Sequence, residues 1–240
     1  MRDAKALKHL GVPMAMLLLA GCSAQAGMTG TDPGSASVGM AYGTEGEAFE
    51  VACSDVSKPE DRVELDAVDS MIQDGEYYAA LARLESVSFD TQAHWLRWAQ
   101  LLGQVGQLDS SEVVFSAIVN SCNSAQAYHG LGVVMVKKGR LGAAVDMLDR
   151  AKDIAPADIS IRNDLGYALL RVGEYGRAAF ELRTAYELSK GQAAIGQNMI
   201  AAYYLNDGEA GLETLKNELA VDDEKLQSGI RLAQKLKGEM

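Results

Sequence analysis

The chain has 240 residues, of which 48% are hydrophobic and 23% are charged, so it is long enough to bury a sizeable core. Asp and Glu outnumber Lys and Arg by 33 to 22, which gives a formal net charge of −11. Because the sequence contains no stripe of basic residues, nucleic acid is not expected as a partner. We interpret the acidic balance as a feature that keeps the protein soluble.

The N-terminus has the pattern of an export signal. Three basic residues precede a short apolar run, residues 11–20, which is too short for a membrane span of about 20 residues. Small residues follow this run. A positive start, a short apolar stretch and small residues in this order predict a secretory signal peptide over residues 1–21.

The signal peptide ends in Leu19-Ala20-Gly21-Cys22, which resembles a bacterial lipobox. The resemblance implies that lipid such as palmitate is attached to Cys22, and that the lipid anchors the chain to a membrane without spanning it. Ser23 follows the cysteine in place of Asp, and by the same resemblance this favours the periplasmic face of the outer membrane. An ordinary signal peptide with an incidental cysteine is the alternative.

Residues 22–59 are rich in Gly, Ser, Thr and Ala and show no helical period, so we expect a flexible tether. With Cys22 lipidated, Cys53 and Cys122 remain. Export implies an oxidising compartment, where a remaining pair favours a disulfide that pins the end of the tether against the folded part. Two free thiols are the alternative.

A Gly followed by a polar residue, usually with Tyr or Leu next, recurs along the chain at steps of 31 to 35 residues. These glycines are Gly75, Gly106, Gly139, Gly173 and, in a weaker copy, Gly208. A period of about 34 residues with a glycine turn between two amphipathic stretches predicts an array of helix–turn–helix units.

The two clearest copies lie within residues 125–190. Gly132 and Ala144 in one copy match Gly166 and Ala178 in the other, at an offset of 34. Small residues at such positions let the two antiparallel helices of a unit approach closely, while large residues fill the space beside them. This pattern resembles the tetratricopeptide (TPR) repeat.

The resemblance implies an all-α TPR solenoid domain over residues 60–240, built from about five helix–turn–helix units. An earlier copy around Trp95 and Trp98 is more divergent, and the copy around Gly208 lacks the small residue of its second helix. Residues 222–237 are predicted to form one more helix, with acidic residues in its first turn and lysines in its last. We expect that helix to cap the C-terminal end of the array.

In TPR folds the first helix of each pair lines the concave face, so the resemblance implies a protein-binding groove. The groove residues expected here are His129, Asn163, Tyr167, Arg171, Asn198 and Lys137, with Leu96 and Gln100 at the matching positions of the earlier copy. Asn amides can hold the backbone of an extended peptide, and the two cations can bind a carboxylate. Ordinary solvated helix residues are the alternative.

The sequence favours no enzymatic chemistry. His94 and His129, the two histidines after the signal peptide, belong to no metal-ligand motif, and the chain has neither a nucleophile elbow nor a phosphate loop. We therefore expect no catalytic residues, no metal and no small-molecule substrate. The only non-protein group expected is the covalent lipid on Cys22.

Signal, tether and array together resemble the TPR lipoproteins of bacterial pilus and secretion machines, most nearly the TadD-type lipoproteins of the Flp (tight adherence) pilus system. The Gly-Glu-Tyr turns and the Asn163-Asp164-Leu165-Gly166 stretch carry this resemblance. It implies an outer-membrane scaffold that acts like a secretin pilotin and binds secretin or other pilus assembly proteins. The alternatives are a TPR subunit of the outer-membrane β-barrel assembly machinery and an adaptor of cell-wall hydrolases.

Overall fold

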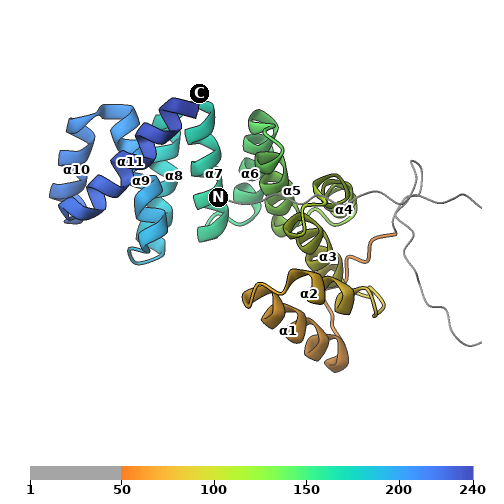
Figure 1. The fold of residues 1–240 in the computed structure, drawn as a ribbon. Coiled ribbons are helices and arrows are strands. Elements are labelled where there is room, and N and C mark those ends of the chain that lie inside the picture. The colour runs from red at the N-terminus through yellow and green to blue at the C-terminus, as the bar shows by residue number, and fades with distance from the viewer. Residues whose placement is uncertain (1–49, 240) are drawn as a thin grey trace, which may run out of the picture. The chain divides into compact units, whose positions relative to one another are not determined.

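The computed structural model describes residues 50–239. The expected signal peptide (1–21), the lipidated Cys22 and most of the expected tether lie outside these residues. Within the described range the chain is helical, with short turns between helices and no strand (Figure 1). The helices are α1 (Pro59–Gln73), α2 (Tyr77–Leu84), α3 (Gln92–Gln104), α4 (Leu108–Cys122), α5 (Ala125–Lys137), α6 (Leu141–Ile154), α7 (Ile159–Val172), α8 (Tyr175–Leu188), α9 (Ala193–Asp207), α10 (Glu209–Leu219) and α11 (Asp223–Glu239).

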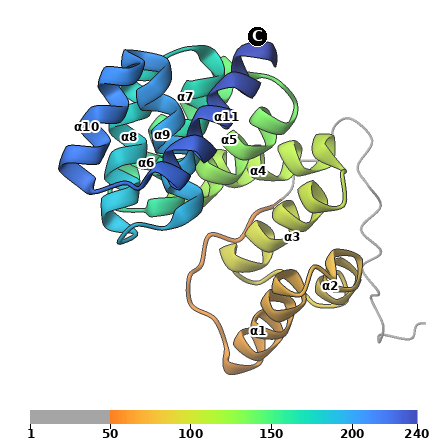
Figure 2. The ribbon, with the colours of Figure 1, turned by 60° about the vertical axis from the view of Figure 1, so that its left-hand side comes forward.

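Consecutive helices pair as hairpins, α1–α2 through α9–α10, and each hairpin packs against the next. The first helices of neighbouring hairpins also contact one another, as α3 does with α5 and α7 does with α9. Helix α11 packs on α9 at the C-terminal end and buries Leu226, Ala233 and Leu236 (Figure 2). The predicted all-α solenoid of five units with a C-terminal capping helix is confirmed for residues 59–239.

Glycines end the first helix of each hairpin, as the repeat pattern predicts. Gly75, Gly106, Gly139 and Gly173 have φ values of 78°, 86°, 75° and 84°. In this left-handed region a side chain would be strained, so glycine closes the helix at the lowest cost. Gly208, with a φ of 62°, lies between α9 and α10 in the same role.

Two further glycines let the helices of a hairpin approach closely. A Cβ added to Gly132 would lie 2.6 Å from Cγ of Leu148, and one added to Gly166 would lie 2.4 Å from Cγ of Leu182. Both leucines are fully buried. A methyl group at either glycine would overpack the core, which typically costs about 1–3 kcal/mol. The small-against-large pairing expected for the two clearest copies is therefore present.

The last hairpin differs from the expectation that its second helix has no small residue. Gly211 is buried in α10, where an added Cβ would lie 2.5 Å from the carbonyl oxygen of Tyr203. The expectation was wrong because it considered only the aligned position, Glu213, whereas the close contact lies two residues earlier. Helix α10 begins at Glu209, directly after the turn glycine, whereas α8 begins two residues after Gly173, so the two hairpins differ in register.

Residues 50–58, which we call the N-terminal strap, form no helix but are attached to the first hairpins. Val51 and Ala52 pack against the core of these hairpins. The carbonyl of Ser54 accepts a hydrogen bond of 3.0 Å from the backbone N–H of Gln92, the first residue of α3. The strap therefore contributes to the folded part even though it belongs to the stretch expected to be a tether.

A disulfide bond attaches the strap covalently. It joins Cys53 to Cys122, the last residue of α4, with the two Cα atoms 5.3 Å apart. This is the pair that remained in the sequence once Cys22 was assigned to lipid. The bond encloses helices α1 to α4 in one loop, so this half of the array has a covalent constraint that spans 69 residues.

The two halves of the array have different cores. In α1–α5 the core combines aliphatic side chains, such as Leu101 and Ile118, with an aromatic cluster. In this cluster Phe89, Trp95 and Trp98 meet edge to face with ring centroids 5.2–5.8 Å apart, and Phe115 of α4 is buried nearby. In α6–α11 the fully buried large side chains are aliphatic, chiefly leucines, together with Met199.

Candidate protein-binding face

The first-helix face carries a row of polar residues linked by hydrogen bonds. Nε2 of His129 lies 2.7 Å from Oδ2 of Asp164, and the amide of Asn163 donates to the other carboxylate oxygen over 3.1 Å. The amide of Asn198 in turn donates to Oδ1 of Asn163, also over 3.1 Å. Three predicted groove residues thus meet across α5, α7 and α9. The linking residue, Asp164, was missed because its neighbour Asn163 occupies the position that TPR patterns assign to the groove.

The other three predicted groove residues lie nearer the turns. Nη1 of Arg171 donates to the hydroxyl of Tyr167 over 3.3 Å, and the guanidinium stands over the tyrosine ring, 6.0 Å from its centroid. Nζ of Lys137 donates over 3.2 Å to the carbonyl of Gly103, one of the carbonyls that α3 leaves unpaired at its C-terminal end. An ammonium group has three N–H donors, so Lys137 keeps two for a ligand.

A cavity of about 440 Å³ opens on this face between α3 and α5. It is lined by Asp69, Leu96, Arg97, Gln100, Gly103, Gln104, Ser111, Phe115, Gln126, His129, Gly130, Val133, Val134, Lys137 and Asp164. Five of these, Leu96, Gln100, His129, Val133 and Lys137, stand at positions that the repeat pattern places on the groove. The sequence did not predict the cavity itself, because its depth depends on side chains of α4 that reach the floor from below.

The charged residues in the middle of the cavity pair with each other. Arg97 contacts both carboxylate oxygens of Asp69, with Nε–Oδ1 at 2.9 Å and Nη2–Oδ2 at 2.6 Å. Bidentate pairs of this kind have strongly fixed geometry. On the opposite side, His129 and Asp164 are joined by a hydrogen bond of 2.7 Å. The polar side chains in the middle of the cavity therefore already have partners within the protein.

The floor of the cavity depends on one coupled departure from the repeat. Phe115 of α4 occupies the position of Leu148 and Leu182 in the clear copies, but its ring reaches farther, as far as α5. There it lies against Gly130, where an added Cβ would be only 2.2 Å from the ring. The ring of Phe115 therefore fills the space that a side chain at Gly130 would take, and both residues line the cavity.

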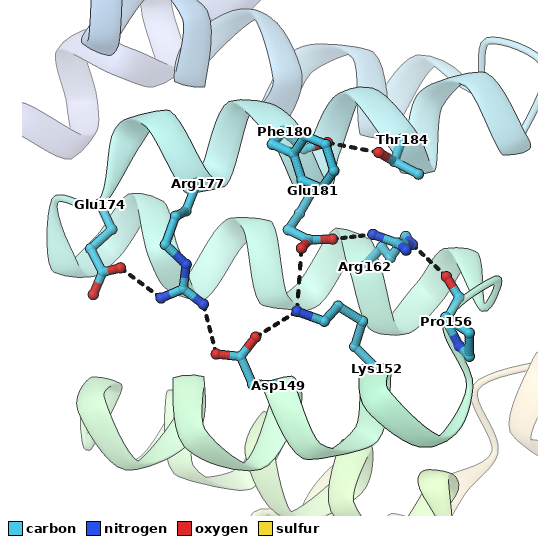
Figure 3. A network of polar contacts seen from close by, with 9 residues as sticks. All are labelled: Asp149, Lys152, Pro156, Arg162, Glu174, Arg177, Phe180, Glu181 and Thr184. Atoms are coloured by element: carbon cyan, nitrogen blue, oxygen red, sulfur yellow. Dashed lines mark hydrogen bonds and ion pairs between the residues drawn. The ribbon is translucent and has the colours of Figure 1, made fainter.

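A separate set of charges joins α6, α7 and α8, as Figure 3 shows. Glu181 is buried and forms ion pairs with Arg162 of α7 and with Lys152 of α6. Asp149 accepts from Lys152 at 2.8 Å and from Arg177 at 2.7 Å. These groups satisfy one another, so we interpret the network as a structural clamp between hairpins and not as a ligand site.

Burial and ion pairing compete within this clamp. Burial alone would raise the pKa of Asp149, but the hydrogen bonds and charges of Lys152 and Arg177 outweigh it and hold that pKa below its usual range. Burial likewise opposes the charge on Lys152, yet Asp149 and Glu181 raise its pKa. The clamp therefore remains charged at neutral pH.

No group of three or more His, Cys, Asp and Glu side chains within residues 50–239 is placed to hold a metal ion. In the same range, every helix is either too short or too polar to cross a membrane. The described part of the chain thus offers the first-helix face, with its cavity, as the candidate site.

The comparisons with known proteins agree with the helical array. No known protein-family profile matches the chain. The chain is 29% identical over 213 residues to the TPR repeat-containing protein PA4299 of Pseudomonas aeruginosa, and the match covers 89% of this chain and 79% of that protein. The fold is that of a TPR solenoid.

Solved TPR structures superpose on most of the array. YrrB, described as a TPR protein with an unusual peptide-binding site, matches with a TM-score of 0.53 and 18% identity over 71% of this chain and 90% of YrrB. A MamA structure matches with a TM-score of 0.52 and 17% identity over 74% of this chain and 99% of MamA. At such identities the superpositions establish the TPR fold alone.

Proposed function

We propose that this protein is an outer-membrane-anchored periplasmic scaffold that binds other proteins through the first-helix face of its TPR solenoid and assists assembly of a Flp/Tad-type pilus or secretion apparatus. In this role it acts like a pilotin for the secretin pore. The observation that carries the binding part of the proposal is the first-helix face itself, where a hydrogen-bonded polar row borders a cavity of about 440 Å³.

The residues on this face suit the backbone of a protein segment. The amides of Asn163 and Asn198 and the nearby glutamines have both donors and acceptors, which an extended backbone also has. The apolar floor provides contact area beneath them. YrrB, which shares the fold, is described as having a peptide-binding site.

Two features support the proposed address. The Leu19-to-Cys22 motif resembles a lipobox, and the disulfide between Cys53 and Cys122 suits an oxidising compartment such as the periplasm. The address is tested by labelling cells with radioactive palmitate and separating inner from outer membranes. A labelled protein in the outer-membrane fraction is expected, with no label in a Cys22→Ser variant. An unlabelled wild-type protein would remove the anchor from the proposal.

The assembly role is tested in a strain that lacks the gene. We expect secretin multimers on gels and surface pili to decrease together in this strain. A plasmid copy of the gene should restore both. Neighbouring genes for pilin, secretin and a secretion ATPase would agree with this role. Normal multimers and normal pili in the deletion strain would exclude it.

The binding face is tested by a crosslinking pull-down from the membrane fraction. The double variant Asn163→Ala, Asn198→Ala removes two amides that bond to each other and leaves the His129–Asp164 contact in place. We expect it to recover less of the partner while keeping the wild-type circular dichroism spectrum. Asn217→Ala, an exposed amide on α10, is the matched control. Undiminished recovery by the folded double variant would reject the row.

A further inference from the structure

The first hairpin, α1–α2, has a small share of buried residues. Of the 15 residues of α1, Leu65 and Val68 are buried, whereas α3 buries eight of its 13. Among the described residues the hairpin has a neighbouring hairpin on one side only, where it packs on α3 (Figure 2). Helices of 15 and 8 residues are marginal without such packing. The hairpin therefore depends strongly on what attaches it to the rest of the array.

The strap attaches this hairpin to the array by two polar contacts and one covalent bond. The carbonyl of Ser54 accepts from the backbone of Gln92, and Lys58 pairs with Asp90 at 3.0 Å. The side chains of that pair are 68% and 43% exposed, and such exposed pairs contribute little to stability. The disulfide to the end of α4 restricts the unfolded chain over a sequence separation of 69 residues. It is therefore the strongest of the three attachments.

Two contacts between the hairpin and α3 depend on the position of the hairpin. Nε1 of Trp98 donates over 3.0 Å to Oε1 of Glu85, at the end of α2. Asp69 of α1 forms the bidentate pair with Arg97, and both residues line the cavity on the first-helix face. If the hairpin moved away from α3, the surroundings of Trp98 would change and the cavity would lose one wall.

The two cysteines of the disulfide differ in exposure. Cys53 is exposed and lies in the strap, outside any helix. Cys122 is half-buried and packs against the core of α1–α5. A thiolate opens a disulfide by attacking one of its sulfur atoms, and the attack needs access to that atom. Cys53 is therefore the residue at which a protein dithiol can open the bond.

We propose that the Cys53–Cys122 disulfide is a redox latch. A protein dithiol opens it by attack at Cys53, and opening frees the strap and the α1–α2 hairpin from α3. The cavity on the first-helix face then loses its α1 wall, so the redox state of this bond regulates the binding face. The last step rests on the proposed function, in which that face binds proteins.

The exchange balances in electrons and protons. A thiolate of the dithiol attacks Sγ of Cys53, the S–S bond breaks, and Cys122 leaves as a thiolate that takes up a proton. The second thiol of the dithiol, after losing its proton, attacks the reductant's own sulfur in the mixed disulfide and releases Cys53 as a thiol. Two electrons and two protons thus pass to this protein, and the dithiol becomes a disulfide. A disulfide of the same class reverses the reaction.

The first test asks whether the bond opens while the protein is folded. Full-length protein in detergent is incubated with reduced thioredoxin, and free thiols are trapped with a polyethylene-glycol maleimide that retards the chain on a gel. We expect both cysteines to become labelled without denaturant. Labelling that occurs only in denaturant would overturn the proposal.

A trapped intermediate identifies the sulfur that is attacked. Thioredoxin whose second active-site cysteine is replaced by Ala cannot complete the exchange, so it stays bound as a mixed disulfide. Digestion and mass spectrometry then locate the adduct. We expect it on Cys53, and an adduct on Cys122 would contradict the direction of attack.

The second test follows the hairpin itself. The chain has two tryptophans, Trp95 and Trp98, and both are buried in the core that α1 and α2 share with α3. On reduction we expect their fluorescence emission to shift to longer wavelength. Amide exchange should become at least about a hundredfold faster in α1 and α2 and stay unchanged in α7 and α8. Identical fluorescence and exchange in the oxidised and reduced protein, or unfolding of the whole array, would overturn the proposal.

The double variant Cys53→Ser, Cys122→Ser is the matched control. It has no bond to open, so it should show the shifted emission and the fast exchange of α1 and α2 without any reductant. Thioredoxin should then change neither signal. A further change on adding thioredoxin would show that the reductant acts on the array by another route, and it would overturn the assignment to this bond.

The link to the binding face is tested by the crosslinking pull-down from the membrane fraction. One sample is reduced and its thiols are blocked with N-ethylmaleimide, and a second sample stays oxidised. We expect the reduced protein to recover several-fold less of the partner, because Asp69 no longer holds Arg97 at the wall of the cavity. Reoxidation before blocking should restore recovery. Equal recovery by the two forms would reject regulation of the face.

The latch and the proposed function can fail separately. A deletion strain with normal secretin multimers would reject the pilus role and leave the results of thiol trapping, fluorescence and exchange intact. Conversely, a loss of multimers in the deletion strain, together with a disulfide that thioredoxin opens only in denaturant, would keep the assembly role and reject the latch.

Discussion

The hairpins α3–α4 and α7–α8 have the same arrangement of helices but differ in the residues at the position where the two helices of the hairpin pack most closely. In α7–α8, Leu182 packs on Gly166 within the hairpin. In α3–α4 the aligned residues are Phe115 and Ala99, and the larger ring of Phe115 extends beyond its own hairpin to Gly130 of α5. A larger side chain in one unit thus fills the space left by a missing side chain in the next. Departures from a repeat are informative when two of them compensate each other.

The largest predicted effect is the loss of stability on removing the disulfide, and it should differ between the two halves of the array. Replacing both Cys53 and Cys122 by Ser removes a link that closes a 69-residue loop, so the free energy of unfolding should fall by about 4 kcal/mol. Hydrogen exchange should become faster in α1–α4 and change little in α7–α8. Uniform acceleration along the whole array would show that the halves do not differ in this respect.

The next largest loss of stability is expected on breaking the ion-pair clamp between α6, α7 and α8. Glu181→Ala leaves the guanidinium of Arg162, which is only 14% exposed, without its carboxylate, and this should destabilise the protein by about 3 kcal/mol in chemical denaturation. Glu187→Ala, which breaks only an exposed pair with Arg183, should cost less than about 0.5 kcal/mol. Similar losses in the two variants would contradict the view that burial makes this clamp important.

The Phe115–Gly130 contact is tested by a double-mutant cycle. Gly130→Ala should destabilise by about 1–2 kcal/mol, because overpacking against the ring exceeds the gain in helix propensity. Phe115→Leu alone should also destabilise, by leaving a void. Because the smaller leucine leaves room for the added methyl group, the double variant should be more stable than the sum of the two changes predicts, by about 1 kcal/mol. Strict additivity would mean that the two residues are not coupled.

The smallest predicted effect is a dependence of stability on pH, which we expect from His94 in the α1–α5 half. His94 is buried, with Nδ1 2.9 Å from the hydroxyl of Thr91, and burial lowers the pKa of His94 below the usual value of 6.5. The unfolded chain therefore binds a proton more readily than the folded one, so stability should be full above pH 6.5 and decrease as the pH falls below it. His94→Gln should flatten this slope, with His129→Gln as the control. If stability still decreases at low pH in His94→Gln, another group must be responsible for the pH dependence.

The sequence predicted those features that depend on one helix or one turn. The glycines with positive φ, such as Gly139 and Gly173, and the small residues Gly132 and Gly166 stand at fixed offsets that can be read directly. It did not predict Gly211, because the close contact of the last hairpin lies two residues before the aligned position, Glu213. The packing of two helices across a turn of different length is not encoded in the spacing of repeated residue types.

The candidate site was predicted only in part for a related reason. His129, Asn163 and Asn198 follow from the repeat, since equivalent positions of stacked helices form a row. The Arg97–Asp69 pair and the Phe115–Gly130 contact depend on the packing of different hairpins, and no periodicity reveals the distances between them. One signal was present: Phe115 is larger than its counterparts, and Gly130 stands in the middle of a helix, where glycine is unfavourable.

The bond between Cys53 and Cys122 also determines how the molecule transmits tension. A force applied at the N-terminal end reaches Cys53, passes through the sulfur atoms to the end of α4 and continues into α5. Helices α1 to α4 lie outside this load path, so pulling cannot unravel them while the bond is intact.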